Sequence, residues 1–151
     1  MLLELMKNTI KRLLREALEE VKYYVGVSKD DSEILHRTQT PDFSMYKTGR
    51  FKGFSVTPSL SLATQEASKH NGQVLSIMLK RDSIIDINHI TNRELKNTFP
   101  NIDDDVLNND VYRDTLILKY AVKNRYGGIK LKDGEVIVIN PSAVIGIHKA
   151  L

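Results

Sequence analysis

Apolar residues near the start of the chain recur at steps of three and four, which is the spacing of one helix face. The charged residues fall mostly on the other side, so the pattern predicts one amphipathic helix over residues 2–24, ended by Gly26. Its polar side mixes acidic and basic residues, so we expect it to pack on its own domain rather than bind a partner or a membrane surface. The apolar positions of this face are Leu2, Leu5, Met6, Ile10, Leu13, Leu14, Ala17, Leu18 and Val21.

Short apolar stretches separated by turn residues follow this helix and predict β-strands. Residues 39–50 are rich in residues that interrupt helices and strands, which predicts a loop. Pro58 ends the strand predicted at residues 53–57. Ser59 or Ser61 can then cap a helix that runs to about Lys69 and ends in a turn at residues 70–72. The strands predicted in this part are residues 33–38, 53–57, 74–79 and 84–87.

The rest of the chain combines a helical segment with further strands. Residues 91–125 are polar and helical in character. An Asp-Gly pair lies between the apolar runs 129–131 and 135–139, which predicts a hairpin, and residues 144–147 form the last strand. Strands near both ends of the sequence with helices between them indicate an α+β domain.

The composition bounds the class of protein. A length of 151 residues fits one domain over residues 1–151, with residues 1–25 as its N-terminal helix and 91–125 as its helical segment. No apolar run approaches the roughly 20 residues that span a bilayer, and charged residues interrupt any signal peptide. The chain has no cysteine, which excludes disulfides, thiolate metal sites and a cysteine nucleophile. We therefore expect a cytoplasmic protein without a membrane partner.

Common catalytic and cofactor motifs are absent. There is no P-loop, GxGxxG or GxSxG motif, and the four histidines are too scattered for a zinc helix, so no metal site is expected. The net charge of +3 allows an anionic ligand without requiring a nucleic acid.

Three polar groups stand out because they lie on predicted apolar strands, and they are His36-Arg37-Thr38, Ser55 with Thr57, and Glu135. On a strand Arg37 points away from His36, and Ser55 shares a face with Thr57. A cation, two hydroxyls and a carboxylate can converge in a cleft that suits phosphates and ribose hydroxyls. Alternatively, Arg37 pairs with an acidic neighbour, the hydroxyls face solvent, and Glu135 merely follows a turn.

At these residues the chain resembles the ADP-ribosyltransferase superfamily. The resemblance covers residues 33–90 and 125–147, about half of the chain, and each motif is weak by itself. The ending is similar to that of the family's phage and mobile-element members. The matching stretches are Ile34 to Thr38, Gly53 to Pro58 with Ala63 in the next helix, Gly72 to Ile77, Tyr126 to Ile129, and Glu135 to Pro141.

The resemblance implies a split β-sheet core around a cleft, NAD as substrate and cleavage of the nicotinamide–ribose bond. In the arginine-serine-glutamate branch, Arg37 holds NAD, Ser55 braces the site, with Thr57 on the same face, and Glu135 is catalytic. In the histidine branch, His36 bonds the ribose, Thr38 completes a His-x-Thr pattern, and Glu135 keeps its role. The two registers remain open.

The chain also departs from the family's pattern. Thr64, Gln65 and Glu66 lie where the histidine branch carries a tyrosine that stacks on nicotinamide. Our hypothesis is that Phe51, Phe54 or Tyr46 supplies the ring instead. Asp133 replaces an upstream glutamate found in arginine-modifying members, and the resemblance does not explain residues 91–125.

The function expected from the resemblance is mono-ADP-ribosylation of a macromolecular target, a protein or a nucleic acid, in the cytoplasm of a host cell. A toxin or phage effector fits this activity. One alternative is a catalytically weakened member of the fold that binds and inhibits a partner. Another is an RNA 2′-phosphotransferase, which also uses NAD and would need Arg37, Arg50 and Lys52 around an RNA phosphate.

Overall fold

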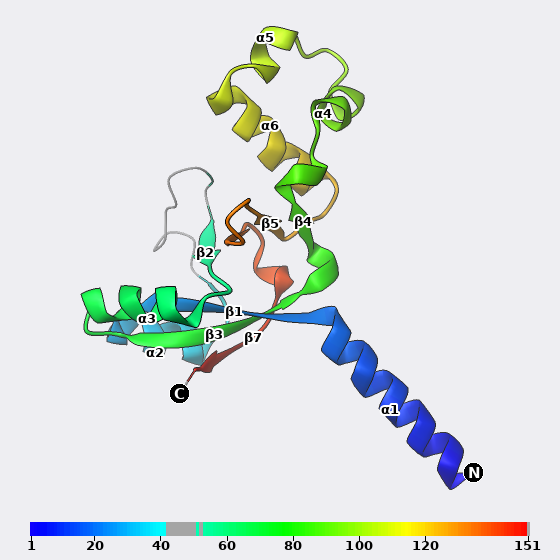
Figure 1. The fold of residues 1–151 in the computed structure, drawn as a ribbon, viewed down its shortest axis with the longest axis vertical. Coiled ribbons are helices and arrows are strands. Elements are labelled where there is room, and N and C mark those ends of the chain that lie inside the picture. Colours follow the sequence, from blue (N-terminus) through cyan, green and yellow to red (C-terminus); the bar gives the residue numbers. More distant parts are fainter. Residues whose placement is uncertain (42–50, 52, 151) are drawn as a thin grey trace.

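The computed structural model describes residues 1–41, 51 and 53–150, with the side chains of 15–18 left out. The α+β class is confirmed, since the structure combines helices with two β-sheets (Figure 1). The helices are α1 (Leu2–Glu19), α2 (Lys29–Thr38), α3 (Leu60–Lys69), α4 (Asn92–Thr98), α5 (Asp104–Leu107) and α6 (Asp110–Lys123). The strands are β1 (Glu20–Val27), β2 (Phe54–Val56), β3 (Gln73–Lys80), β4 (Ile84–Asp86), β5 (Gly128–Lys130), β6 (Val136–Val138) and β7 (Val144–Lys149). Three short 3-10 helices are η1 (Arg81–Ser83), η2 (Ile87–His89) and η3 (Pro141–Ala143).

The strands form two sheets that meet at one point. One sheet has the antiparallel order β1-β3-β7, and the other has the order β2-β6-β5-β4 with β4 and β5 parallel. Tyr24 of β1 and Thr57, just after β2, form an isolated bridge. Tyr24 N donates to Thr57 O at 2.7 Å, and Thr57 N donates to Tyr24 O at 2.9 Å. This bridge holds the end of β2 against the edge of the three-stranded sheet.

The four-stranded sheet separates two hydrophobic cores. Along β6, Val136 and Val138 belong to the core that the two sheets share, whereas Ile137 belongs to the core beneath α4, α5 and α6. Such alternation is what a strand with two buried faces requires. The three helices connect the parallel strands β4 and β5, since a parallel pair needs a long crossover. Residues 91–125 thus cover the core beneath α4, α5 and α6.

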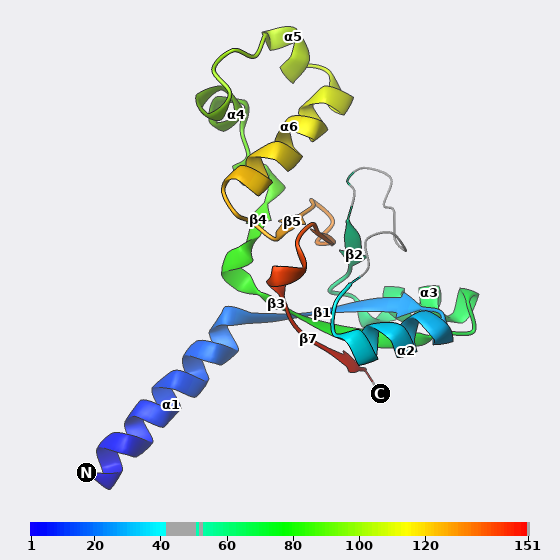
Figure 2. The ribbon, with the colours of Figure 1, turned by 180° about the vertical axis from the view of Figure 1, so that it is seen from behind.

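The prediction of one helix through residue 24 is wrong, because strand β1 begins at Glu20. Residues 21–27 alternate, and Tyr23, Val25 and Val27 enter the core while β1 pairs with β3 along its whole length. β-Branched and aromatic residues favour this strand over a continued helix. The expected packing of α1 on its own domain is also wrong, since its described apolar side chains lie exposed and the helix points away from the sheets (Figure 2). Within the described residues, no helix has both the length and the apolar character needed to cross a membrane.

The predicted strand at residues 33–38 is instead part of helix α2. Ser28 caps this helix by accepting a hydrogen bond from Asp31 N at 3.2 Å, and Leu35 is fully buried in the core between the sheets. After the helix, Gln39 pairs with the edge strand β7, donating to Ile147 O at 2.7 Å and accepting from Ile147 N at 2.8 Å. The cap and these long-range contacts stabilise a helix here instead of a strand. The sequence pattern of residues 33–38 alone does not contain these contacts.

The other predicted elements are confirmed. Strands β2, β3, β4 and β7 lie where the apolar stretches indicated, and β5 and β6 form the expected antiparallel hairpin. Ser59 is the cap of α3, because its hydroxyl accepts a hydrogen bond from Leu62 N at 3.2 Å. The turn after α3 places Asn71 at φ 48, a left-handed conformation that asparagine tolerates.

Gly26 permits the close approach of α3 to β1, and its replacement tests this contact. A Cβ atom on Gly26 would lie 2.1 Å from Ala63 O and 2.5 Å from Ala67 N. We predict that Gly26→Ala lowers the free energy of unfolding by about 1–3 kcal/mol, as overpacking does. Gly146→Ala is the control, because its Cβ would meet only the flexible His148 ring at 3.1 Å. Urea unfolding measures both, and equal losses would contradict the prediction.

Candidate functional site

A cleft of about 430 Å³ lies where the end of β2 bridges to β1. This volume is within the range of small-molecule sites. Its walls come from β1, the end of β2, the stretch of α3 from Leu62 to Glu66, and the turn between β5 and β6. The lining residues are Tyr24, Val25, Gly26, Ser55, Val56, Thr57, Leu62, Ala63, Gln65, Glu66, Asp133 and Glu135.

The hydroxyls of Ser55 and Thr57 reach the cleft because β2 alternates. Phe54 and Val56 are buried in the core, so Ser55 and Thr57 turn to the opposite face, where both are half-buried. Thr57 Oγ1 accepts a hydrogen bond from Ser59 N at 3.1 Å, which links the end of β2 to the start of α3. The hydroxyl can still donate its own hydrogen to a ligand.

The β5–β6 turn positions Glu135. The turn residue Gly134 has φ 91, and Asp133 Oδ1 accepts a hydrogen bond from Glu135 N at 2.9 Å. A Cβ on Gly134 would lie 3.4 Å from Pro58 Cγ, so the turn sits directly against the residue that follows Thr57. Because β2 and β6 pair up to Val56 and Val136, residues 57 and 135 are the next positions along the same ladder.

The described lining of the cleft is acidic. It contains the carboxylates of Glu66, Asp133 and Glu135, and none of its described residues is Lys, Arg or His. Burial raises the pKa of Glu135, and the nearby negative charge of Asp133 raises it further. At Glu66 the hydrogen bond from Lys69, at 2.9 Å, lowers the pKa. The cleft therefore favours hydroxyl-bearing or cationic groups and repels a bare phosphate.

The structure brings together only some of the predicted site residues. Ser55, Thr57 and Glu135 line the same cleft, as predicted. His36, Arg37 and Thr38 do not, because they lie exposed on α2, which packs on the opposite face of the three-stranded sheet from α3 (Figures 1 and 2).

The predicted aromatic residues are also elsewhere. Phe54 is fully buried in the core between the sheets, and Phe51 is buried in the core beneath α4–α6, so neither ring is exposed to a ligand. The candidates Tyr46, Arg50 and Lys52 lie outside the described residues.

Sequence reasoning missed the β1 wall of the cleft. Tyr24, Val25 and Gly26 line it, but the helical periodicity of the preceding residues extended through Val21 and hid the strand. The signal that could have revealed it is the alternation of Val21, Tyr23, Val25 and Val27.

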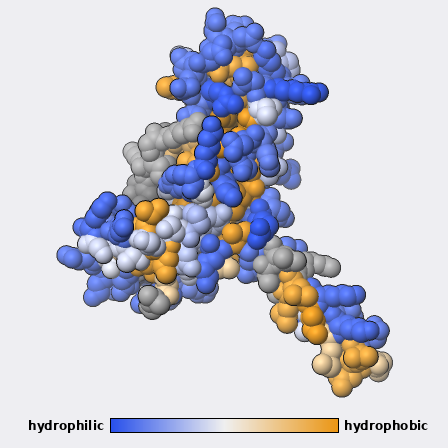
Figure 3. Space-filling view, viewed as in Figure 1, coloured by the Kyte–Doolittle hydropathy of each residue, from blue (hydrophilic) through white to orange (hydrophobic). Residues whose placement is uncertain are grey.

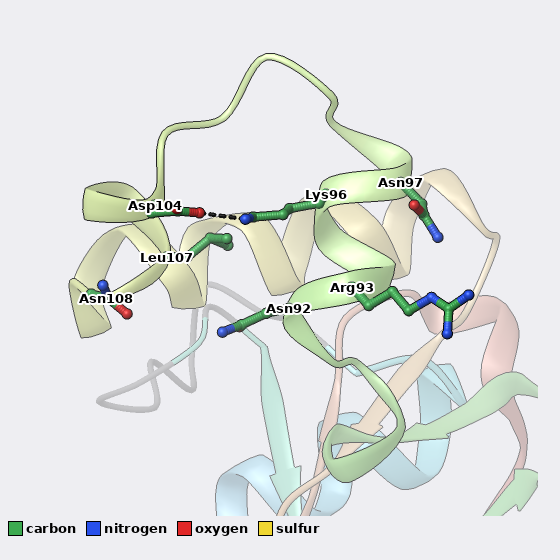
Figure 4. Close-up of a pocket in the computed structure, with 7 residues that line it drawn as sticks. All are labelled: Asn92, Arg93, Lys96, Asn97, Asp104, Leu107 and Asn108. Atoms are coloured by element: carbon green, nitrogen blue, oxygen red, sulfur yellow. Dashed lines mark ion pairs between the residues drawn. The ribbon is translucent and has the colours of Figure 1, made fainter.

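A second pocket, of about 490 Å³, lies between α4 and α5 (Figure 4). Lys96 forms an ion pair with Asp104 there, while the side chains of Arg93 and Asn97 point away from that pair. Its polar groups diverge, so this pocket is a weaker candidate than the acidic cleft. Over the described residues, no three His, Asp or Glu side chains are grouped so as to hold a metal ion.

Comparisons of the chain with protein-family models, with curated proteins and with solved structures gave no match. The functional assignment therefore depends on the geometry and chemistry of the cleft.

The raised pKa of Glu135 predicts a stability cost. A glutamate whose pKa is higher in the folded state binds more protons there, so stability falls as pH rises from the unfolded value of 4.5 through the folded pKa. We therefore expect Glu135→Gln to have a higher melting temperature than the parent at pH 7, and the difference to vanish below pH 4. Glu33→Gln, at an exposed position of α2, is the control. A Glu135→Gln protein that is less stable at pH 7 would exclude this reading.

Proposed function

We propose that this chain is an NAD-dependent mono-ADP-ribosyltransferase with the split β-sheet core of that superfamily, modifying a macromolecular target. The observation that carries the proposal is that Ser55, Thr57 and Glu135, from separate parts of the sequence, line one cleft beside the bridge between two sheets. A toxin or phage effector acting in a host cytoplasm fits this activity.

The acidic cleft suits the reacting end of NAD. Cleavage of the nicotinamide–ribose bond leaves the bonding electron pair with neutral nicotinamide and develops positive charge at the ribose C1′. An ionised Glu135 would stabilise that charge and accept a hydrogen bond from a ribose hydroxyl. The acceptor nucleophile then bonds to C1′ and loses its proton. The positive nicotinamide ring also suits the carboxylates of Asp133 and Glu66.

The same charges direct the rest of the dinucleotide. Because the described lining of the cleft offers no cation, the pyrophosphate would have to lie away from Asp133 and Glu135. Tyr24 and Leu62 supply the apolar surface against which the nicotinamide ring would pack, in place of the phenylalanines expected from the sequence.

Nicotinamide release from NAD tests the role of Glu135. We expect Glu135→Gln to lower the rate by about a hundredfold or more, the effect of removing one transition-state contact. Arg37→Ala and Glu33→Gln should keep the parent rate, because α2 holds both residues outside the cleft. Release that survives in Glu135→Gln would reject the assigned carboxylate.

The pH profile tests the coupling between the two acidic residues. Activity needs Glu135 ionised, so the rate should rise with pH through its raised pKa. Asp133→Asn keeps an oxygen for the hydrogen bond from Glu135 N but removes the negative charge. We expect the acidic limb of the profile for kcat/KM to move to lower pH in this variant. An unshifted or upward-shifted limb would contradict the coupling.

The absence of a cation from the described lining favours a second candidate function, a catalytically weakened member of the same fold that binds a partner in the cleft. The acidic walls would then hold a basic segment of that partner. No nicotinamide release from the parent protein, even with a cell extract as acceptor, would support this alternative over the transferase.

A further inference from the structure

Helix α1 carries an apolar face that nothing in the described chain covers. Figure 3 shows hydrophobic patches along one side of the helix, with hydrophilic residues on the other side. The seven large apolar side chains that the structure describes on this helix after Met1 are between 53% and 74% exposed. They are Leu2, Leu3, Leu5, Met6, Ile10, Leu13 and Leu14. Few soluble helices leave so much apolar surface in water, so this face indicates an interaction site.

The spacing along this face is that of a two-stranded coiled coil. Leu3, Met6, Ile10 and Leu13 follow one another at steps of three, four and three, which places them at alternating a and d positions of a heptad. With Leu3 at a, Ile10 is also at a and Leu13 is at d, and this combination favours two strands. We propose that α1 pairs with α1 of a second copy of this chain.

A second helix would bury the side chains at the a and d positions. Leu3, Met6, Ile10 and Leu13 are each more than half exposed, so each of them has apolar surface to remove from water on pairing. An isolated helix of 18 residues is marginally stable in water, so pairing would also stabilise α1 itself.

A second copy suits this helix better than a lipid surface. Interfacial membrane helices commonly place Trp or Phe at the lipid boundary, and the sequence of Leu2–Glu19 contains no aromatic residue. Its charges also have both signs, with Glu4 preceding Lys7 and Lys11 and Glu19 ending the helix. The carboxylates on this face oppose binding to an anionic lipid surface.

The position of α1 leaves the cleft open in a dimer. The helix joins β1 at Glu20, whereas the cleft lies at Tyr24 to Gly26, toward the other end of the strand. Figure 2 shows α1 extending away from the sheets, so a second helix can lie along it. Pairing through α1 therefore does not require the cleft residues to move.

Sedimentation equilibrium of the full chain tests the pairing. We expect a concentration-dependent dimer of twice the 17.2 kDa chain mass. The double variant Ile10→Gln with Leu13→Gln removes two apolar contacts from each helix and should raise the dissociation constant about a hundredfold or more. The matched control, Asn8→Gln with Lys11→Gln on the polar side, should dimerise like the parent. Circular dichroism checks that the sheets remain folded in both variants.

Each alternative occupant gives a distinct result that overturns the proposal. A parent protein that stays monomeric up to high micromolar concentration excludes the second copy. A dimer that persists unchanged in the Ile10→Gln, Leu13→Gln variant places the interface elsewhere. Monomeric protein that binds vesicles of anionic phospholipid, and loses that binding in the same variant, assigns the face to a membrane.

Discussion

Two backbone hydrogen bonds between Tyr24 and Thr57 join the two sheets, and the candidate site depends on this junction. The bridge brings the end of β2 to the edge of β1 just where β2 stops pairing with β6. The cleft lies beside this bridge, with β1, the end of β2, α3 and the β5–β6 turn around it. Gly26 determines how close α3, which forms another wall of the cleft, lies to β1. Only a residue without a Cβ lets α3 approach β1 so closely.

The same junction places Glu135 where its surroundings raise the pKa of its carboxyl group. A hairpin turn held against Pro58 places this carboxylate half-buried beside Asp133, where burial and like charge both raise its pKa. A chain optimised only for stability would have a neutral residue here. A carboxylate kept in a cleft at some cost to the stability of the fold is a candidate for chemistry.

The helical segment and α1 have different relations to the sheets. Helices α4 to α6 form the crossover between parallel strands and bury Ile117 and Leu95 in a core of their own. Packing thus accounts for the buried residues of this segment. Helix α1 buries none of its described apolar face, so packing within the described chain does not account for that face.

The sequence by itself determined the elements whose signals are local. Pro58 and Ser59 mark the end of β2 and the start of α3, and the Asp133-Gly134 pair marks the hairpin, because turn and cap chemistry involves only near neighbours. Alternation along β2 likewise placed Ser55 and Thr57 on one face. These local rules also gave the three residues that the cleft unites.

Only the tertiary structure decided what depends on distant contacts. The helical periodicity extends through Val21, yet pairing with β3 makes residues 20–27 a strand. The contacts of Leu35 and Gln39 hold a helix where a strand was expected. His36 and Arg37 are consequently exposed on α2 and do not line the cleft. Strand pairing and burial between segments dozens of residues apart outweigh local preference, and no short window of sequence contains both partners.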